Sequence, residues 1–286
     1  MHHKSILARD GRSLTARVAG PPNGFPVVLL HGQMHSSSCW NAVLSGPLAR
    51  DHRLIAPDLA GHGGSDTPRL ADTDWMADDL ADVLSALGVT DPVLIGWSFG
   101  SAVAAAYASG RATRGLVLVS AGTRAPGAHG LSLAQVRAML DQAAVACDAI
   151  GAEHPPALDL FRAMLSDERA VADDGVARMI DTCANGQLDA ATRAERIANG
   201  HAISLATRAA IAATPYDYAD FYAIYDRPIL QIHGDRDVVR PVAAAHERKA
   251  IFRHGETEIW TGSGHSPFDA EPARFAERIA AFCAAL

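Results

Sequence analysis

A G-x-S-x-G pattern occupies residues 96–100, Gly96-Trp97-Ser98-Phe99-Gly100, between an apolar run and a stretch of small residues. A tight turn from a strand into a helix would hold the serine hydroxyl in the open at the helix N-terminus. Glycines on both flanks permit the strained backbone of such a turn. We therefore predict that Ser98 is a nucleophile. Because a hydroxyl is weakly nucleophilic at neutral pH, a base must take its proton and later return it.

That base is expected at His265. It lies in a glycine-rich loop, Thr261-Gly262-Ser263-Gly264-His265-Ser266-Pro267, between the last expected strand and the last expected helix. An open α/β sheet presents its active site at the carboxyl ends of its strands, where this loop would begin. An isolated loop histidine is usually only solvated, so the position of His265 after a strand is what favours catalysis.

An imidazole that acts as a base needs a carboxylate to fix its tautomer and stabilise its charged form. The segment His233-Gly234-Asp235-Arg236-Asp237 follows the penultimate expected strand and offers two candidates. We favour Asp237, because Asp235 follows a glycine directly and is better placed to shape the turn. Asp226 precedes the same strand and would lie at its other end.

The elements that must position these residues alternate short apolar runs with helical patterns, which is typical of βαβ units and a mostly parallel sheet. An opening hairpin is expected at residues 6–8 and 14–18, around the Asp10-Gly11 turn. Continuous apolar runs predict strands covered on both faces. The further strands are expected at residues 26–31, 53–57, 93–97, 116–119, 228–233 and 257–260.

From residue 122 to residue 222 the strand rhythm stops and alanine-rich helical patterns take over. We expect residues 122–222 to form a helical cap inserted into a core made of residues 1–121 and 223–286. The cap would control which substrate enters and would contribute no catalytic residue, because Ser98, Asp237 and His265 all lie outside it. None of the histidines in this segment lies in a glycine-rich loop after a strand, so we expect them at the surface. They are His129, His154 and His201.

The amino-acid composition and net charge indicate which classes of partner the protein can bind. Of the 286 residues, 49% are apolar and 20% are charged, as in ordinary globular proteins. The net charge of -7 offers no basic surface for nucleic acid or anionic membrane, and no apolar run is long enough to span a membrane. The N-terminal residues lack the apolar stretch of a secretory signal, and the four cysteines form no C-x-x-C pair. We expect a cytoplasmic enzyme with a small-molecule substrate, no metal and no other cofactor.

The chain order Ser98, Asp237, His265, with the G-x-S-x-G turn and the Gly264-His265 loop, resembles the α/β-hydrolase superfamily, specifically its single-domain members with a helical cap. The resemblance covers nearly the whole chain outside the expected cap. It implies an α/β-hydrolase fold, with a mostly parallel central sheet flanked by helices. It also implies an oxyanion hole formed by the backbone N–H groups of Gln33, in the segment His31-Gly32-Gln33-Met34, and of Phe99.

Relatives that act on haloalkanes or epoxides carry an aspartate where Ser98 stands, which disfavours those reactions and leaves acyl-enzyme chemistry. We expect a serine esterase acting on a small apolar carboxylic ester or lactone, because the cap and four apolar side chains would line the entrance. These side chains are Met34, Trp97, Phe99 and Phe268. The alternatives are a carbon–carbon bond hydrolase, a perhydrolase, an acyltransferase, or a ligand-binding protein with slow turnover. The loop around His62 is interpreted as scaffold.

Overall fold

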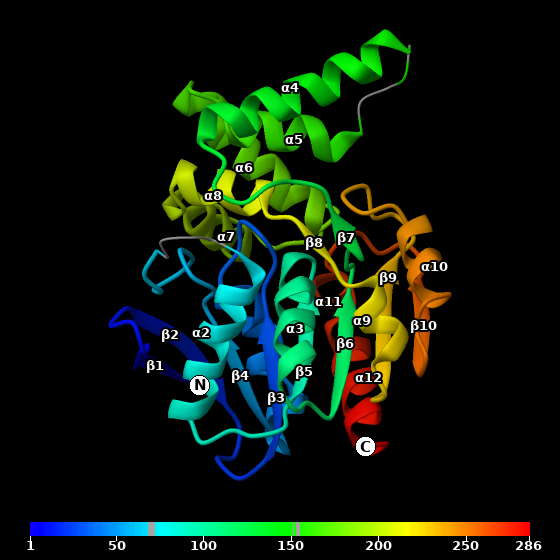
Figure 1. Ribbon diagram of the computed structural model, residues 1–286. Helices are drawn as coiled ribbons and strands as arrows, with labels where there is room; N and C mark the ends of the chain where they lie inside the picture. Colours follow the sequence, from blue (N-terminus) through cyan, green and yellow to red (C-terminus); the bar gives the residue numbers. More distant parts are fainter. Residues whose placement is uncertain (68–71, 151, 153–154) are drawn as a thin grey trace.

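An eight-stranded sheet, in the order β1-β2-β4-β3-β5-β6-β9-β10, forms the centre of the computed structural model, which describes residues 1–67, 72–150, 152 and 155–286 (Figure 1). The strands are β1 His2–Leu7, β2 Ser13–Ala19, β3 Phe25–Leu30, β4 His52–Pro57, β5 Val93–Trp97, β6 Gly115–Val119, β9 Ile229–Gly234 and β10 Gly255–Trp260. β1 and β2 form an antiparallel hairpin, β2 pairs antiparallel with β4, and the pairs from β4 to β10 are parallel. The expected α/β architecture is confirmed.

The parallel register aligns the carboxyl ends of the central strands. Gly96 of β5 lies opposite Leu30 of β3, and Trp97 lies opposite Val119 of β6. Val119 in turn pairs with Ile232 of β9. The loops that follow these strands therefore meet at one edge of the sheet, and this edge receives the predicted site residues.

Helices cover both faces of the sheet because each presents an apolar stripe to it. One face packs against α2 Thr73–Ala86 and α3 Phe99–Gly110. The opposite face packs against α1 Asn41–Leu44 and α12 Pro272–Ala284. The short helices that remain near the sheet are η1 Ser37–Trp40, η2 Pro47–Arg50, α9 Ala219–Ile224, α10 Ala243–Lys249 and α11 Pro267–Ala270.

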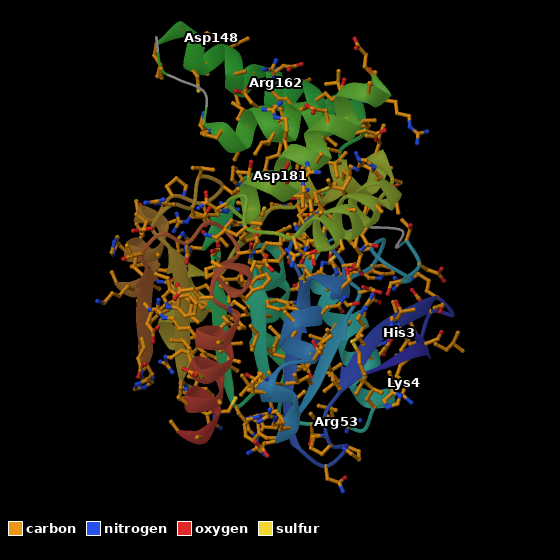
Figure 2. The ribbon with its side chains drawn as sticks, turned by 180° about the vertical axis from the view of Figure 1, so that it is seen from behind. His3, Lys4, Arg53, Asp148, Arg162 and Asp181 are labelled. Atoms are coloured by element: carbon orange, nitrogen blue, oxygen red, sulfur yellow. The ribbon has the colours of Figure 1, made fainter. Side chains whose placement is uncertain are left out.

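Five helices lie above the carboxyl edge of the sheet (Figure 1): α4 Leu133–Ala149, α5 Pro156–Met164, α6 Arg169–Cys183, α7 Ala190–Ala202 and α8 Leu205–Ala213. Seen from behind, Asp148 and Arg162 lie far from the sheet, whereas Asp181 lies nearer to it (Figure 2). Within the described residues, none of the helices is long and apolar enough to cross a membrane.

Two short strands connect the beginning and the end of this helical segment. β7 Arg124–Ala125 pairs antiparallel with β8 Tyr216–Asp217, which brings segments distant in sequence side by side. The apolar patterns did not predict this pair, because two residues are too few to show a period of two. The pair lies where the chain leaves and re-enters the core.

The helical segment is joined to the core by a buried ion pair. Both Nη atoms of Arg196, on α7, lie 2.5–2.6 Å from the carboxylate of Asp269, on α11, and the side chains are only 5% and 6% exposed. Arg196 also donates to the carbonyl of Cys39. A second connection comes from Ser266, whose N–H and hydroxyl both donate to the carbonyl of Cys183 at the end of α6.

Candidate active site

Ser98 occupies the turn between β5 and α3 with φ of 52° and ψ of −116°, a conformation that a residue with a side chain rarely adopts. The two flanking positions must be glycine because a side chain would clash with the backbone nearby. A Cβ on Gly96 would lie 2.4 Å from Cα of Ser101, and a Cβ on Gly100 would lie 2.4 Å from the carbonyl oxygen of Leu30. The N–H of Ser98 donates to the carbonyl of Val119, which fixes the turn to the neighbouring strand.

His265 lies between Ser98 and Asp237. Its Nε2 atom is 2.8 Å from the Ser98 hydroxyl oxygen, and its Nδ1 atom is 2.7 Å from Oδ2 of Asp237. Because a carboxylate only accepts hydrogen bonds, we assign the proton to Nδ1, which leaves Nε2 free to accept from the serine hydroxyl. The indole N–H of Trp97 donates to the carbonyl of His265 at 2.8 Å and holds the loop in place.

The Asp237 carboxylate is buried, and both of its oxygens have partners. Oδ1 accepts the backbone N–H groups of Val239 and Arg240 at 2.9 and 2.8 Å. Burial alone would raise the pKa of Asp237, but the charge and hydrogen bond of His265 and the backbone donors outweigh it and hold that pKa below its usual value. Asp237 is therefore ionised at neutral pH, as a partner of an imidazolium requires.

His233 is a second histidine near the same carboxylate. Its Nε2 atom lies 3.3 Å from Oδ2 of Asp237 and 2.8 Å from the carbonyl oxygen of Arg240. Burial lowers the pKa of His233, which favours the neutral ring. With its proton on Nε2, His233 donates to the carbonyl of Arg240 and lies as a neutral ring beside Asp237.

The other two candidate carboxylates lie elsewhere. Asp235 accepts the backbone N–H of Gly262 at 2.7 Å and so ties the loop after β9 to the loop that carries His265. Asp226 is exposed, precedes β9 and pairs with Arg227. The structure thus brings Asp237 to His265 and gives Asp235 a role in the loop.

The two amides expected to form an oxyanion hole flank Ser98. Phe99 is the first residue of α3, so its N–H has no acceptor within the helix. Within the described part of the chain, the Gln33 N–H also donates to no protein acceptor. Both residues line the cavity that contains Ser98, so both amides are available to a ligand there.

His31 fixes the peptide that carries the Gln33 amide. Its Nε2 atom accepts the N–H of Leu59 at 2.9 Å, so the proton is on Nδ1, which donates to the carbonyl of Gly32 at 2.8 Å. The N–H of His35 donates to the same carbonyl. Because the C=O and N–H of a trans peptide point in opposite directions, holding the Gly32 carbonyl also sets the direction of the Gln33 N–H.

Two adjoining cavities contain Ser98. The larger, of about 170 Å³, is lined by Gln33, Phe99, Phe161 and Arg240 among others. The smaller, of about 20 Å³, is lined by the predicted pocket residues Met34 and Trp97, together with His265 and with Met179 of α6. The helices above the sheet therefore contribute walls to both cavities, through Phe161 and Met179.

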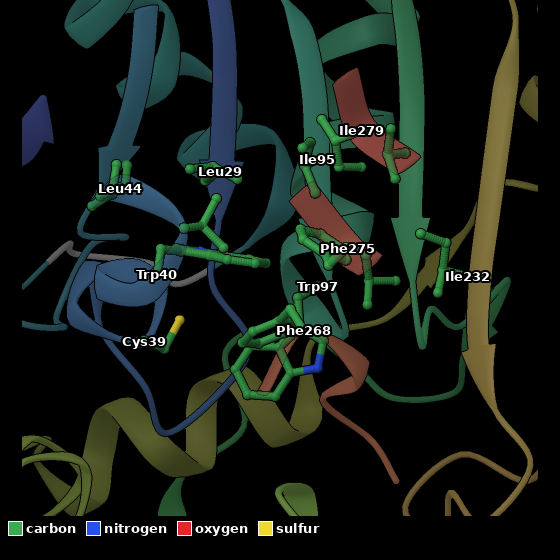
Figure 3. Close-up of a cluster of buried hydrophobic side chains, with 14 of the residues drawn as sticks. Leu29, Cys39, Trp40, Leu44, Ile95, Trp97, Ile232, Phe268, Phe275 and Ile279 are labelled. Atoms are coloured by element: carbon green, nitrogen blue, oxygen red, sulfur yellow. The ribbon is translucent and has the colours of Figure 1, made fainter. Parts of the chain in front are cut away.

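The prediction that Phe268 lines the pocket is wrong. Its side chain is 1% exposed and packs in the core, with its ring 4.3 Å from that of Trp40 and 5.0 Å from that of Trp97 (Figure 3). Phe268 lines neither of the two cavities that contain Ser98, and it packs in a T-shaped arrangement with the Trp97 ring.

Several lining residues were missed by the sequence analysis. Val239 and Arg240 lie two and three residues after Asp237, so their place in the loop after β9 could have indicated that they line the cavity. Tyr216 of β8 and Met179 of α6 gave no local signal, because their position depends on how the helical segment packs on the core.

Among the described residues, no histidine other than His265 lines either of the two cavities. His62 is buried against His31, with ring centroids 5.0 Å apart, and burial lowers the pKa of His62 to about 3, which agrees with a scaffold role. His129 is exposed, and Nε2 of His201 lies 3.1 Å from the carbonyl oxygen of Asp173. His154 lies outside the described residues.

Comparison with known proteins shows the family to which the chain belongs. A family model described as the alpha/beta hydrolase family matches residues 27–278. The solved structure of an esterase from Rhodococcus sp. ECU1013 is similar, with a TM-score of 0.82 and 29% identity over 100% of both chains. A non-heme chloroperoxidase from Streptomyces lividans is 28% identical, covering 94% of this chain and 95% of its own. An uncharacterised protein of Mycobacterium tuberculosis is 30% identical, covering 93% of this chain and 76% of its own. The chain therefore belongs to the α/β-hydrolase family.

Proposed function

We propose that the protein is a serine hydrolase that forms an acyl-enzyme from a small apolar carboxylic ester or lactone. Ser98 is the nucleophile, His265 the general base and Asp237 the acid that orients it. The observation that carries this proposal is the continuous chain of hydrogen-bonding distances, 2.8 Å from Ser98 to His265 and 2.7 Å from His265 to Asp237. The similarity to an esterase over the full length of the chain supports it.

In this mechanism Nε2 of His265 takes the proton of Ser98 as the hydroxyl oxygen attacks the carbonyl carbon. The negative charge that develops on the carbonyl oxygen is stabilised by the N–H groups of Gln33 and Phe99. The imidazolium, stabilised by Asp237, then protonates the leaving oxygen, and the bond to the alcohol breaks. Water then attacks the acyl-enzyme by the same steps, with His265 as base, which releases the carboxylic acid and restores Ser98.

The cavities favour a small and mostly apolar substrate. A volume of about 170 Å³ is below the 300–1,000 Å³ typical of sites for drug-sized ligands. Apolar side chains supply much of the wall, including Phe99, Phe161, Ile211 and Val239. A short acyl chain fits this environment better than a long or highly polar one.

We further propose that residues 122–222 act as the substrate-selecting cap of a core formed by residues 1–121 and 223–286. The support is that five helices of this segment lie above the edge of the sheet that carries Ser98. Phe161 and Met179 supply its walls, whereas no proposed catalytic residue lies in it. The cap excludes water while the ester is bound.

A cytoplasmic location agrees with the state of the cysteines. All four are free thiols, and three of them, Cys39, Cys183 and Cys283, are buried. Burial raises the pKa of each of these three thiols, so they are unreactive at neutral pH.

Perhydrolysis is the second candidate, because the chain is similar to a non-heme chloroperoxidase over 94% of its length. It would use the same acyl-enzyme, with hydrogen peroxide in place of water in the second half of the reaction. The two activities therefore share Ser98 and differ only in the acceptor.

The test is a screen of p-nitrophenyl esters of increasing acyl length, with lactones, diketones and a peroxide arm. We expect turnover of short acyl esters and loss of activity in Ser98→Ala on the order of 10⁴ to 10⁶. Ser109→Ala is the matched control, because Ser109 lies on the same helix and its hydroxyl donates to the carbonyl of Ala106, away from the cavities. Retention of more than about a tenth of the activity by Ser98→Ala would contradict the proposal.

A further inference from the structure

The larger cavity beside Ser98 contains one cationic side chain. Arg240 follows Asp237 by three residues, and its Nη2 atom donates to the hydroxyl of Tyr216 at 3.1 Å, a residue that also lines the cavity. A Cβ on Gly122 would lie 3.1 Å from the guanidinium carbon, so the absence of a side chain there makes room for Arg240. The described residues that line this cavity include no carboxylate.

The charge of Arg240 is not compensated within the described part of the chain. No carboxylate oxygen there lies within 4.0 Å of its guanidinium. The carboxylate nearest in sequence, that of Asp237, is occupied by the backbone N–H groups of Val239 and Arg240 and by His265. Asp217, beside Tyr216, pairs with Arg124 instead.

Most of the hydrogen-bonding capacity of this guanidinium is also unused. A guanidinium has five N–H donors arranged to match a carboxylate, and the structure records one side-chain hydrogen bond from Arg240. By comparison, Arg196 uses its donors in a two-pronged pair with Asp269. A half-buried guanidinium with free donors at the wall of a cavity has the chemistry to bind a carboxylate.

We propose that Arg240, oriented by Tyr216, binds a carboxylate on the substrate, so that the preferred substrates are esters or lactones that also carry a free carboxylate. This inference rests on the proposed function. The apolar wall between Ser98 and Arg240, which includes Phe99 and Val239, would contact a short methylene spacer between the two polar groups. Because the protein as a whole has a net charge of -7, attraction of an anion depends on this local cation.

The experiment compares matched substrates in which a carboxylate replaces a methyl group of similar size, and it follows how each pair responds to the variants. On the acyl side, monoethyl glutarate is paired with ethyl pentanoate; on the alcohol side, para-carboxyphenyl butanoate is paired with para-tolyl butanoate. The quantity measured is the ratio of kcat/KM for the charged and the neutral member of each pair. The pair with the higher ratio shows on which side of the scissile bond the carboxylate binds.

We expect the wild-type ratio to exceed one for at least one pair and to fall by about tenfold or more in Arg240→Gln. Arg240→Lys should retain part of the preference, because it keeps the charge but not the planar fork. Arg236→Gln is the matched control, since it removes the same charge from an exposed position in the same loop and should leave the ratio unchanged. Tyr216→Phe, which keeps the cation, should reduce the ratio less than Arg240→Gln.

Arg240 could instead only tie β8 to the core through Tyr216. In that case Arg240→Gln and Tyr216→Phe would change both members of each pair equally, and an unchanged ratio would overturn the inference. Calorimetric binding of glutarate to Ser98→Ala tests the subsite without turnover, and we expect Arg240→Gln in that background to weaken this binding by about tenfold. If Ser98→Ala still hydrolyses esters while glutarate binding depends on Arg240, only the proposed function fails.

Discussion

Oδ2 of Asp237 lies 2.7 Å from Nδ1 of His265, whereas the carboxylate of Asp235, two residues earlier, accepts the N–H of Gly262. Asp237→Asn should therefore reduce kcat by about 10⁴, because an amide at this position favours the wrong tautomer of the imidazole. Asp235→Asn should have a milder effect, since it weakens one hydrogen bond between two loops. Steady-state kinetics on the same ester measure both variants, and the opposite ranking would assign the acid role to Asp235.

The proposed oxyanion hole uses the backbone amides of Gln33 and Phe99, so we expect it not to depend on the Gln33 side chain. Gln33→Ala should be tolerated within about tenfold, because the side chain makes only a long hydrogen bond, 3.4 Å, to the carbonyl of Arg208. Gln33→Pro deletes the N–H and should reduce kcat by about 10² or more. Circular dichroism checks that the proline variant is folded. Equal effects of the two changes would show that the side chain itself contacts the substrate.

The fold was predictable where the sequence pattern is local. The six segments predicted as further strands each coincide with an observed strand to within two residues. Five of them, all but β10, are mostly buried, and strands buried on both faces leave a continuous apolar signal. The hairpin is also confirmed, although β1 starts at His2, and both His2 and His3 pair with β2. The glycines that flank Ser98 indicated a tight turn in the sequence, and the structure leaves no room for a side chain at either position.

The parts that were not predicted depend on contacts between distant segments. Phe268 follows the loop of His265, but whether it faced the cavity or the core depended on the direction of α11. Arg240 and Tyr216 meet only because β8 returns beside β7. No local pattern reports either arrangement, since each is fixed by tertiary packing.

The ion pair between Arg196 and Asp269 should stabilise the attachment of α7 to the core. Arg196→Met leaves the buried carboxylate of Asp269 without its partner and should lower the free energy of unfolding by about 3–5 kcal/mol. The double variant Arg196→Met, Asp269→Leu should lose less, because no buried charge remains. Arg193→Met, which breaks an exposed pair with Asp181, is the control and should cost at most about 1 kcal/mol. Urea denaturation measures all three, and equal losses for the two single variants would contradict the prediction.

The cap should select substrates through the residues that reach the cavities. Of four apolar residues in the segment, Phe161 lines both cavities, whereas Met139, Met164 and Ile203 pack within the protein. Phe161→Ala should change kcat/KM between short and long acyl chains by about 10- to 200-fold. Met139→Ala should leave this selectivity unchanged. If Met139→Ala changed the selectivity as much as Phe161→Ala does, direct contact of Phe161 with the substrate would not be the cause.

Covalent labelling tests whether Ser98 is the residue that carries the acyl group. The protein is treated with a small organophosphate, residual esterase activity is followed, and the modified peptide is identified by mass spectrometry. We expect one phosphoryl group per chain, attached to Ser98, and loss of activity in proportion to labelling; His265→Ala should label far more slowly. An adduct on another residue, or full activity after complete labelling of Ser98, would contradict the mechanism.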